Sequence, residues 1–417
     1  MTNEAAITRR AMLRAIAAGS IAAALAACGV TTVSGPPSAT AGATPAPTPV
    51  GPSSAPSATP SPPPSTPSPT AKPVPLRVRI ARMLMVGFRG LEIGPDDPIA
   101  VALAGGLGGV ILFDRDQLTG GSRNIASPRQ LAALTASLRA AATSPLRIAI
   151  DQEGGKVSRL NPAKGFPATK TEAAIGATDD PAVARAAGLA MGKTMAAAGI
   201  DLDLAPVVDV NVNPNNPAIG ALGRSFSADP SIVAAMAEAE IRGLHEAGVR
   251  ATLKHFPGLG SAAANTDFAV VDVTKTWTEA ELEPYATLIG LGLPDAIMSG
   301  NIVNRTLDPS GVPASLSKPI IEGMLRSRYG WTGAVLTDDL GAVAITSRYK
   351  RADAVARAIE AGNDLLVFAN QASYVPDLAA RLVDSIEGLV TSGRISEARI
   401  DTSIARLDRL VGPPPTS

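Results

Sequence analysis

Acid–base chemistry in this chain must rest largely on carboxylates, because its 417 residues include only two histidines. Three aspartates stand at positions suited to such chemistry. Asp151 and Asp338 each follow a short apolar run, and Asp267 lies in a loop rich in small residues. Which of these carboxylates act depends on the elements that position them.

Asp151 opens the string Asp-Gln-Glu-Gly-Gly at residues 151–155. Its carboxylate can accept hydrogen bonds from hydroxyl groups, and Arg159 can reach back toward the same place. Two consecutive glycines allow the backbone to approach a ligand closely. The alternative interpretation is a turn that carries a solvated carboxylate.

Arg224 lies in the string Gly-Arg-Ser-Phe at residues 223–226, after a loop rich in proline and asparagine. Asp229 and Pro230 follow it as a helix cap and a first helical residue. Arg224 is therefore the functional candidate of this segment. A surface arginine is the alternative.

Lys254 and His255 end an apolar run and open the string Lys-His-Phe-Pro-Gly at residues 254–258. The loop that follows is long and rich in small residues, carries Asp267 as its acid, and resembles a mobile lid. The alternative for His255 is a hydrogen-bonded histidine of the core.

Asp338 and Asp339 follow the apolar run at residues 334–337. Adjacent residues of a strand point to opposite sides, so at most one of the two faces a site directly. The other either orients its neighbour or caps the next helix. The alternative is that both acids cap the next helix.

Eight apolar runs separated by helical segments predict an α/β fold, a single (β/α)8 TIM-type barrel. In such barrels the chemistry lies at the carboxyl ends of the strands. An open doubly wound sheet is the rival, but the chain lacks the glycine motifs that hold phosphates in nucleotide-binding versions. The expected strands are residues 85–88, 109–113, 147–151, 202–208, 251–255, 296–300, 334–338 and 364–368, and the clearest helices are 181–198, 231–247, 318–328 and 349–361.

Residues 1–27 have the pattern of an export signal, with Arg9 and Arg10 before an uncharged run at 15–27. The arginine pair resembles a twin-arginine signal, although ordinary secretory signals also carry arginines. Cys28, the single cysteine, follows Leu-Ala-Ala as in the lipobox of bacterial lipoproteins. The alternative is a chance cysteine in an alanine-rich run. We expect an exported protein that is lipid-anchored at Cys28 to the outer face of the cell membrane.

Residues 28–75 are rich in proline, serine and threonine and predict a disordered, extended linker. Residues 76–417 form the barrel domain. Charge is balanced at 37 basic and 37 acidic residues, which argues against a nucleic-acid partner. No clustered ligand spacing suggests a metal, nothing implies an organic cofactor, and a monomer is the default.

Together the motifs resemble the β-N-acetylhexosaminidases of glycoside hydrolase family 3 over residues 78–412. Five strings occur in the family's order. They are residues 151–155, Ala-Pro-Val-Val-Asp-Val at 205–210, residues 223–226, residues 254–258 and Thr-Asp-Asp-Leu at 337–340. The resemblance implies a TIM-type barrel and a retaining, exo-acting mechanism on a carbohydrate substrate. It implies that Asp338 is the nucleophile. The residues it assigns to binding of the terminal sugar are Asp151, Arg159, Arg224, Lys254 and His255.

The loop departs from the family pattern, in which Asp-x-His supplies the acid/base. Asn265, Thr266 and Asp267 stand in its place, and two further histidines are replaced by Leu259 and Asn301. Asp267 is the candidate acid/base. This role requires a raised pKa, which a partly desolvated site supplies.

The expected function is removal of a terminal β-linked sugar, N-acetylglucosamine from cell-wall-derived glycans. Two alternatives remain open because the loop histidine is absent. One is a non-catalytic lipoprotein that binds such glycans, and the other is a glycosidase or phosphorylase with a different sugar preference. Retention of Asp338 argues against a pure binder.

Overall fold

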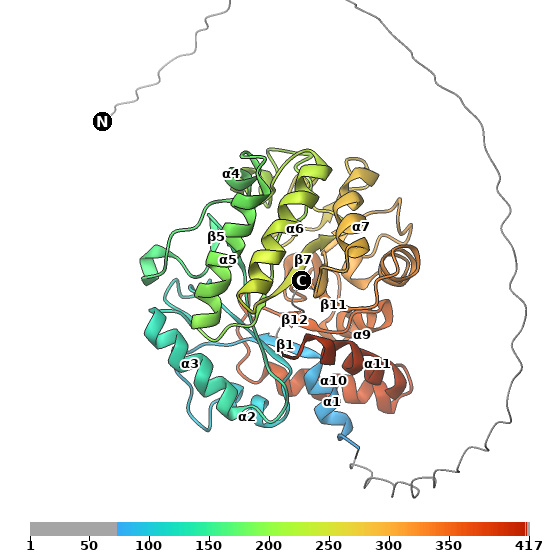
Figure 1. Ribbon diagram of the computed structural model, residues 1–417. Helices are drawn as coiled ribbons and strands as arrows, with labels where there is room; N and C mark the ends of the chain where they lie inside the picture. Colours follow the sequence, from blue (N-terminus) through green and yellow to red (C-terminus); the bar gives the residue numbers. More distant parts are fainter. Residues whose placement is uncertain (1–72, 413, 415–417) are drawn as a thin grey trace, which may run out of the picture. The chain divides into compact units, whose positions relative to one another are not determined.

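Eight short parallel strands form the centre of the molecule, in a computed structural model that describes residues 73–412 and 414 (Figure 1). Their order in the sheet is β11-β9-β7-β6-β3-β2-β1-β12. The strands are β1 (Leu84–Gly87), β2 (Gly109–Leu112), β3 (Arg147–Ile150), β6 (Leu202–Asp203), β7 (Arg250–Phe256), β9 (Ala296–Ser299), β11 (Ala334–Thr337) and β12 (Leu366–Phe368).

The sheet closes on itself. A parallel bridge between Leu336 and Leu365 joins β11 to the start of β12, and β12 pairs with β1 from Leu84 onward. All eight expected runs are barrel strands, so the predicted (β/α)8 fold is confirmed and the rival open sheet is wrong. Because every strand runs parallel to its neighbours, their carboxyl ends meet at one mouth.

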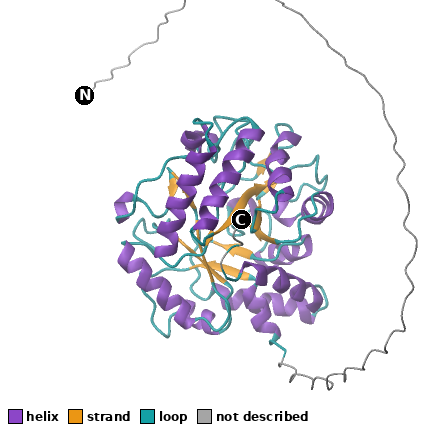
Figure 2. Cartoon of the chain, in the orientation of Figure 1, coloured by secondary structure: helices purple, strands orange, loops and turns teal. Residues whose placement is uncertain are grey.

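Helices surround the barrel, with the strands inside them (Figure 2). Sequence signals set their beginnings: Asp180 and Asp229 cap α5 and α6, and a proline occupies the first position of each. The helices are α1 (Leu76–Arg82), α2 (Pro98–Ala104), α3 (Pro128–Ala141), α4 (Glu172–Gly176), α5 (Pro181–Ala197), α6 (Pro230–Glu246), α7 (Glu283–Gly290), the π-helical η5 (Pro319–Arg328), α8 (Val343–Thr346), α9 (Arg351–Ala361), α10 (Leu378–Thr391) and α11 (Glu397–Leu407).

The expected strand at residues 202–208 is much shorter than its apolar run. β6 ends at Asp203, and Pro206 interrupts the ladder because it has no N–H to donate. The chain rejoins the barrel at Val207, which forms a bridge with Lys254 of β7. Asp209 is thereby carried to the mouth beside Lys254 and His255.

A small hairpin follows β3 directly and consists of β4 (Gln152–Gly154) and β5 (Val157–Ser158). Its glycines have a packing role. A Cβ on Gly154 would meet the carbonyl oxygen of Lys170 at 2.3 Å, and Gly155 has a φ of 55°. A second small sheet pairs β8 (Val271–Asp272) with β10 (Ile302–Val303).

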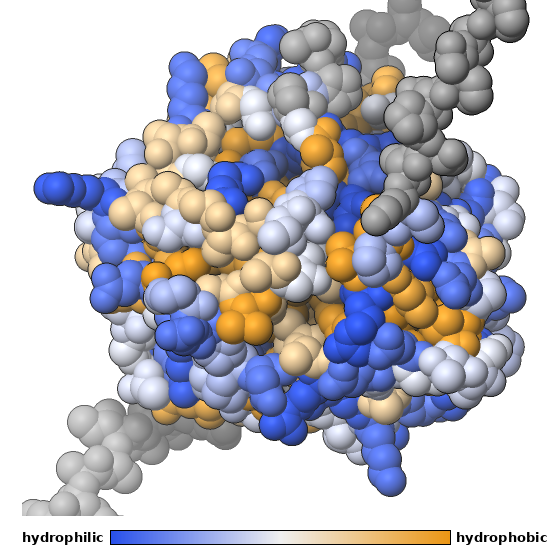
Figure 3. Space-filling view, turned by 90° about the horizontal axis from the view of Figure 1, so that it is seen from below, coloured by the Kyte–Doolittle hydropathy of each residue, from blue (hydrophilic) through white to orange (hydrophobic). Residues whose placement is uncertain are grey.

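The expectations for the export signal, Cys28 and most of the linker fall on residues 1–72, outside the described part. Among the described residues, no helix combines the length and apolar character that crossing a membrane requires. Polar and apolar residues are interspersed on the face shown in Figure 3, which agrees with the mixed polar and apolar composition of the sequence.

Candidate active site

The mouth of the barrel collects the candidate residues from distant parts of the chain. Asp151 follows β3, Lys254 and His255 belong to the end of β7, and Asp338 follows β11. The backbone N–H of Asp338 donates to the carbonyl of Ser299, the last residue of β9. The parallel barrel therefore places these side chains at one end, as the sequence predicts.

A chain of ion pairs links four of the candidate side chains with Glu153. The Lys254 ammonium lies 2.8 Å from Asp151 and 2.6 Å from Glu153. Arg224 binds both oxygens of Glu153 through two hydrogen bonds of 2.6 and 2.7 Å. Arg159 contacts the other oxygen of Asp151 at 3.3 Å. The network spans three segments of the chain and fixes their relative positions.

Burial and charge act in opposite directions in this network. Burial disfavours ionisation of Asp151 and Glu153, but the neighbouring cations outweigh it and hold the pKa of both carboxyls below their usual range. Burial likewise opposes the charge of Lys254, whose pKa is nevertheless raised by Asp151 and Glu153. The network is therefore fully ionised near neutral pH and offers fixed charges to a polar ligand.

Glu153 is a site residue that reasoning from the sequence missed. It is almost fully buried and accepts hydrogen bonds or ion pairs from both Arg224 and Lys254. The resemblance implied that Arg224 binds sugar directly. In the structure its guanidinium donates hydrogen bonds to Glu153 and to the carbonyl of Ala218. The available signal for Glu153 was its position in the sequence. It lies between Asp151 and the glycine pair, and basic residues follow this motif.

His255 is held by Asp209, a buried carboxylate. Nδ1 of His255 donates to Asp209 at 2.7 Å, and the same carboxylate accepts the backbone N–H groups of His255 and Leu259. Nε2 makes no hydrogen bond within the described part of the chain. The second histidine, His245, pairs with Asp295 just before β9, at the opposite end of the barrel.

Asp338 and Asp339 have different surroundings. Asp338 accepts the N–H of Asp339 at 2.7 Å and forms no ion pair with any described residue. Asp339 accepts the N–H groups of Gly341 and Ala369 and so ties the end of β11 to the end of β12. Burial raises the pKa of Asp339 to about 7, and the charge of Asp338 adds to the shift. Asp338 is thus the carboxylate of the pair that remains available.

Asp267 lies in the same field of charges. Solvent reaches its side chain, yet partial burial, and then the charge of Asp338, raise its pKa. Arg224 and His255 act against this shift. The carbonyl of Asp267 accepts the N–H of Val343 in the segment that follows Asp338 and Asp339, and the raised pKa of Asp267 is the direction that a general acid needs.

The loop that carries Asp267 differs from the expected mobile lid in its first half. Residues 257–262 are buried, and Leu259 and Gly260 donate backbone hydrogen bonds to Asp209 and Glu281. The second half is held by fewer contacts. Its carbonyls at Thr266 and Asp267 accept the N–H groups of residues 344 and 343 at the start of α8.

The two other replaced histidine positions are now structural. Leu259 is buried in the core. The side-chain amide of Asn301 donates to the carbonyl of Asp339 at 2.8 Å and its oxygen accepts from Ser315. Asn301 therefore supports the turn that follows the two adjacent acids.

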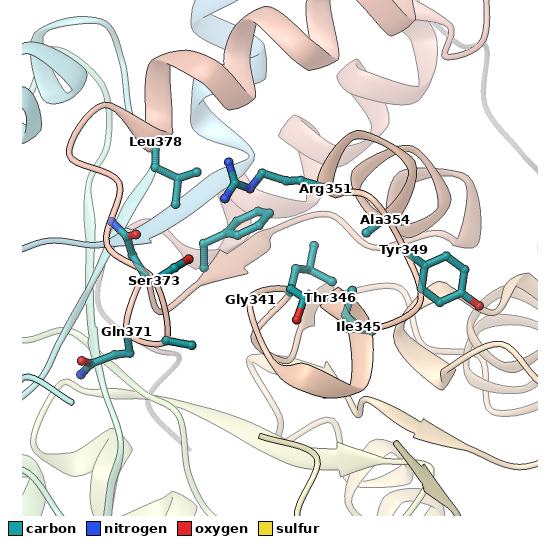
Figure 4. A pocket seen from close by; sticks show the side chains of 13 residues that line it. Gly341, Ile345, Thr346, Tyr349, Arg351, Ala354, Gln371, Ser373 and Leu378 are labelled. Carbon is teal, nitrogen blue, oxygen red and sulfur yellow. The ribbon is translucent and has the colours of Figure 1, made fainter. Parts of the chain in front are cut away.

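Two cavities stand out near these elements. A pocket of about 50 Å³ lies between the segment after β11 and the loop after β12, with Gly341, Arg351 and Ser373 on its walls (Figure 4). It is large enough for water but too small for a sugar ring. A cavity of about 520 Å³ lies against α5 and is lined mainly by apolar side chains without any carboxylate. Neither replaces the charged mouth as the candidate site.

No group of three or more histidine, cysteine or acidic side chains among the described residues is arranged to hold a metal ion. The chemistry that the mouth itself can perform is that of two carboxylates beside a charged polar cluster. One carboxylate is free of ion pairs, and the other has a raised pKa. Enzymes that break a glycosidic bond usually use two such carboxyl groups.

Comparison with known proteins agrees with this geometry. The model of the glycosyl hydrolase family 3 N-terminal domain matches residues 76–410. The chain belongs to glycoside hydrolase family 3. The family description and the names of the relatives confirm the expected enzyme class, a glycosidase that hydrolyses O-glycosyl bonds.

Relatives in this family share about a third of their residues with the chain. A beta-hexosaminidase of Xylella fastidiosa (strain M23) is 36% identical over 322 residues, which cover 73% of this chain and 87% of the relative. A family 3 beta-N-acetylglucosaminidase from Paenibacillus sp. str. FPU-7 superposes with a TM-score of 0.74 at 36% identity, covering 81% of this chain and 62% of that longer protein. The beta-N-acetylhexosaminidase of Beutenbergia cavernae DSM 12333 gives a TM-score of 0.72 at 32% identity, covering 81% and 98%.

Proposed function

We propose that this family 3 glycosidase removes a terminal β-linked N-acetylglucosamine by a retaining mechanism. The observation that carries the proposal is the convergence of Asp338, which forms no ion pair, with the loop of Asp267, whose backbone carbonyl accepts the N–H of Val343 in the segment after Asp338. Burial and then the charge of Asp338 raise the pKa of Asp267. The names of the relatives, beta-hexosaminidase and beta-N-acetylglucosaminidase, support this choice of sugar.

The terminal sugar binds at the ion-pair network. Asp151 offers carboxylate oxygens to its hydroxyls, and Lys254 and the two arginines offer N–H groups. His255 adds Nε2, which has no other partner in the described chain. Because Glu153 and Asp209 hold Arg224 and His255 in place, these groups are already oriented when the sugar arrives.

The reaction then proceeds in two steps. Asp338 attacks the anomeric carbon while protonated Asp267 gives its proton to the glycosidic oxygen, so the leaving group departs with that oxygen and a glycosyl ester forms. In the second step, ionised Asp267 takes a proton from water. The water oxygen attacks the anomeric carbon, and Asp338 departs as a carboxylate.

The proposed location is the outer face of the cell membrane, with lipid attached to Cys28. This rests on the export pattern of residues 1–27, which ends at the chain's single cysteine. The proline-rich linker would hold the barrel clear of the bilayer. At that place the enzyme meets glycans released from the cell wall, which we propose as its substrates.

The test compares aryl β-glycosides of several sugars as substrates for the barrel domain, residues 76–417. We expect hydrolysis of the N-acetylglucosamine derivative, a loss of about a thousandfold or more in Asp338→Asn, and a smaller loss in Asp267→Asn that grows as the leaving group becomes more basic. Activity of the parent enzyme falls as pH rises through the pKa of Asp267, because the first step needs its proton.

Several outcomes contradict the proposal. Binding of sugar without release of any aryl group indicates a glycan-binding protein. Turnover that requires phosphate and yields a sugar phosphate indicates a phosphorylase. An Asp267→Asn variant as active as the parent on substrates with basic leaving groups removes Asp267 as the acid/base. An aryl glycoside of another sugar that is hydrolysed faster changes the assigned specificity.

A further inference from the structure

Phe268 is the most exposed large hydrophobic side chain in the described part of the chain, with 72% of its surface accessible. Aromatic residues make up only 3% of the sequence. Leaving an aromatic ring in water forgoes the free energy of its burial. A ring in this position is therefore a candidate contact surface for a ligand.

The ring belongs to the mouth of the barrel. Phe268 directly follows Asp267, and its N–H donates to the carbonyl of Asn265 in the turn that presents both residues. The exposed side chain of Val270 lies on the same loop. Val212 is exposed on the neighbouring loop, which is joined to this one by a hydrogen bond from the Asn213 N–H to the carbonyl of Gly260.

The position of Asp267 decides which part of a substrate lies near Phe268. A general acid must reach the glycosidic oxygen, which joins the terminal sugar to the leaving group. The terminal sugar is taken by the charged network deeper in the mouth, where Lys254 is 2% exposed. The solvent side of Asp267 is therefore the side of the leaving group.

We propose that Phe268 is the platform of a leaving-group subsite that takes a ring, namely a second sugar or an aryl group. The flat face of a sugar ring carries C–H groups, which pack on an aromatic face while its hydroxyls remain in water. This inference rests on the proposed glycosidase function and adds a preference to it. Substrates whose leaving group is a ring react with higher kcat/KM than substrates without one.

The experiment uses Phe268→Ala in the barrel domain with two substrates of the same terminal sugar. One is the β-1,4-linked dimer of N-acetylglucosamine, and the other is the methyl β-glycoside of N-acetylglucosamine, whose leaving group has no ring but also needs the proton of Asp267. We expect kcat/KM for the dimer to fall about three- to tenfold and that for the methyl glycoside to change less than about twofold. Phe268→Tyr, which keeps the ring, restores the value for the dimer.

Val270→Ala is the matched control, because it removes an exposed apolar side chain from the same loop. It leaves both substrates unaffected. An equal loss on the dimer and the methyl glycoside in Phe268→Ala overturns the subsite and indicates a general disturbance of Asp267. Unchanged turnover of the dimer overturns it as well. If the parent hydrolyses neither substrate, the proposed function itself fails, so the two failures are distinguishable.

Discussion

Single residues at this site act through partners that lie far away in the sequence. Asp209 accepts three hydrogen bonds, one from the ring of His255 and two from the backbone N–H groups of His255 and Leu259. Because a carboxylate only accepts, it fixes the proton of His255 on Nδ1 and leaves Nε2 for a ligand. Asp209 thus positions a binding group without touching the substrate.

Replacement of this carboxylate tests that role. In Asp209→Asn the amide presents a donor toward groups that are themselves donors, so at least one of the three hydrogen bonds is lost. We expect kcat/KM to fall about ten- to a hundredfold. Most of the loss should be in KM, measured by steady-state kinetics with an aryl β-glycoside.

Asp203→Asn is the matched control. Asp203, at the end of β6, is another fully buried aspartate, and burial raises its pKa well above the usual range. Its oxygen accepts the N–H of Gln152, and an asparagine oxygen does the same. The control should keep kcat/KM within about twofold. A loss as large as that of Asp209→Asn would mean that any change in this strand disturbs the mouth.

At the scale of elements, the loop at residues 257–270 has two parts with different tasks. The first part is fixed from both sides, because Leu259 contacts Asp209 and Gly260 donates to Glu281 in the short helix η3 (Glu279–Leu282). The second part carries Asp267 and Phe268 into solvent. The fixed half determines where the exposed half emerges, and so where the acid/base stands.

Glu281 makes this anchoring dependent on pH. Burial raises its pKa to about 7. A carboxyl whose folded-state pKa lies above its unfolded value binds its proton more tightly in the folded state. The free energy of unfolding therefore falls as pH rises from the unfolded pKa toward 7, by about 1–3 kcal/mol for this group.

Glu281→Gln removes this contribution. The glutamine oxygen still accepts from Gly260, and the side chain carries no charge at any pH. We expect the Tm to fall less steeply between pH 5 and pH 8 in the variant than in the parent, measured by thermal unfolding at several pH values. Glu279→Gln, in the same short helix but with an exposed side chain, should keep the parent's slope. Parallel curves for all three proteins would contradict the assignment.

For the whole molecule, closure of the barrel is what assembles the site. The bridge between β11 and β12 completes the ring, so Asp338 meets groups from β3 and β7 at one mouth. The described barrel has its own core, formed by buried side chains from every strand. The barrel core and the site it positions therefore lie within the described residues.

The proposed anchor is tested in the full-length protein. Cys28→Ser removes the thiol that would carry the lipid, so we expect the enzyme to move from the membrane fraction to the soluble fraction. Incorporation of a labelled fatty acid should be lost as well. Hydrolysis of a small aryl glycoside should stay within about twofold of the parent, because the barrel is unchanged. A variant that remains in the membrane fraction and is still labelled would refute lipidation at Cys28.

Local patterns in the sequence were sufficient for the barrel and for part of the site. Apolar runs marked all eight strands, and an acid or a lysine–histidine pair at their ends marked Asp151, Lys254 and Asp338. Asp180 and Asp229, each followed by proline, marked the starts of α5 and α6. These features follow from the periodicity of side chains along a strand or helix, which neighbouring residues alone express.

Only the tertiary structure decided how the charged groups are paired. Glu153 holds Arg224, 71 positions along the chain, and Lys254 pairs with Asp151 across 103 positions. It also showed that Asp209 orients His255 and that half of the loop before Asp267 is fixed. No local pattern encodes these contacts. The ion pairs form only when closure of the barrel brings the charged groups within a few ångströms of one another and removes them from water.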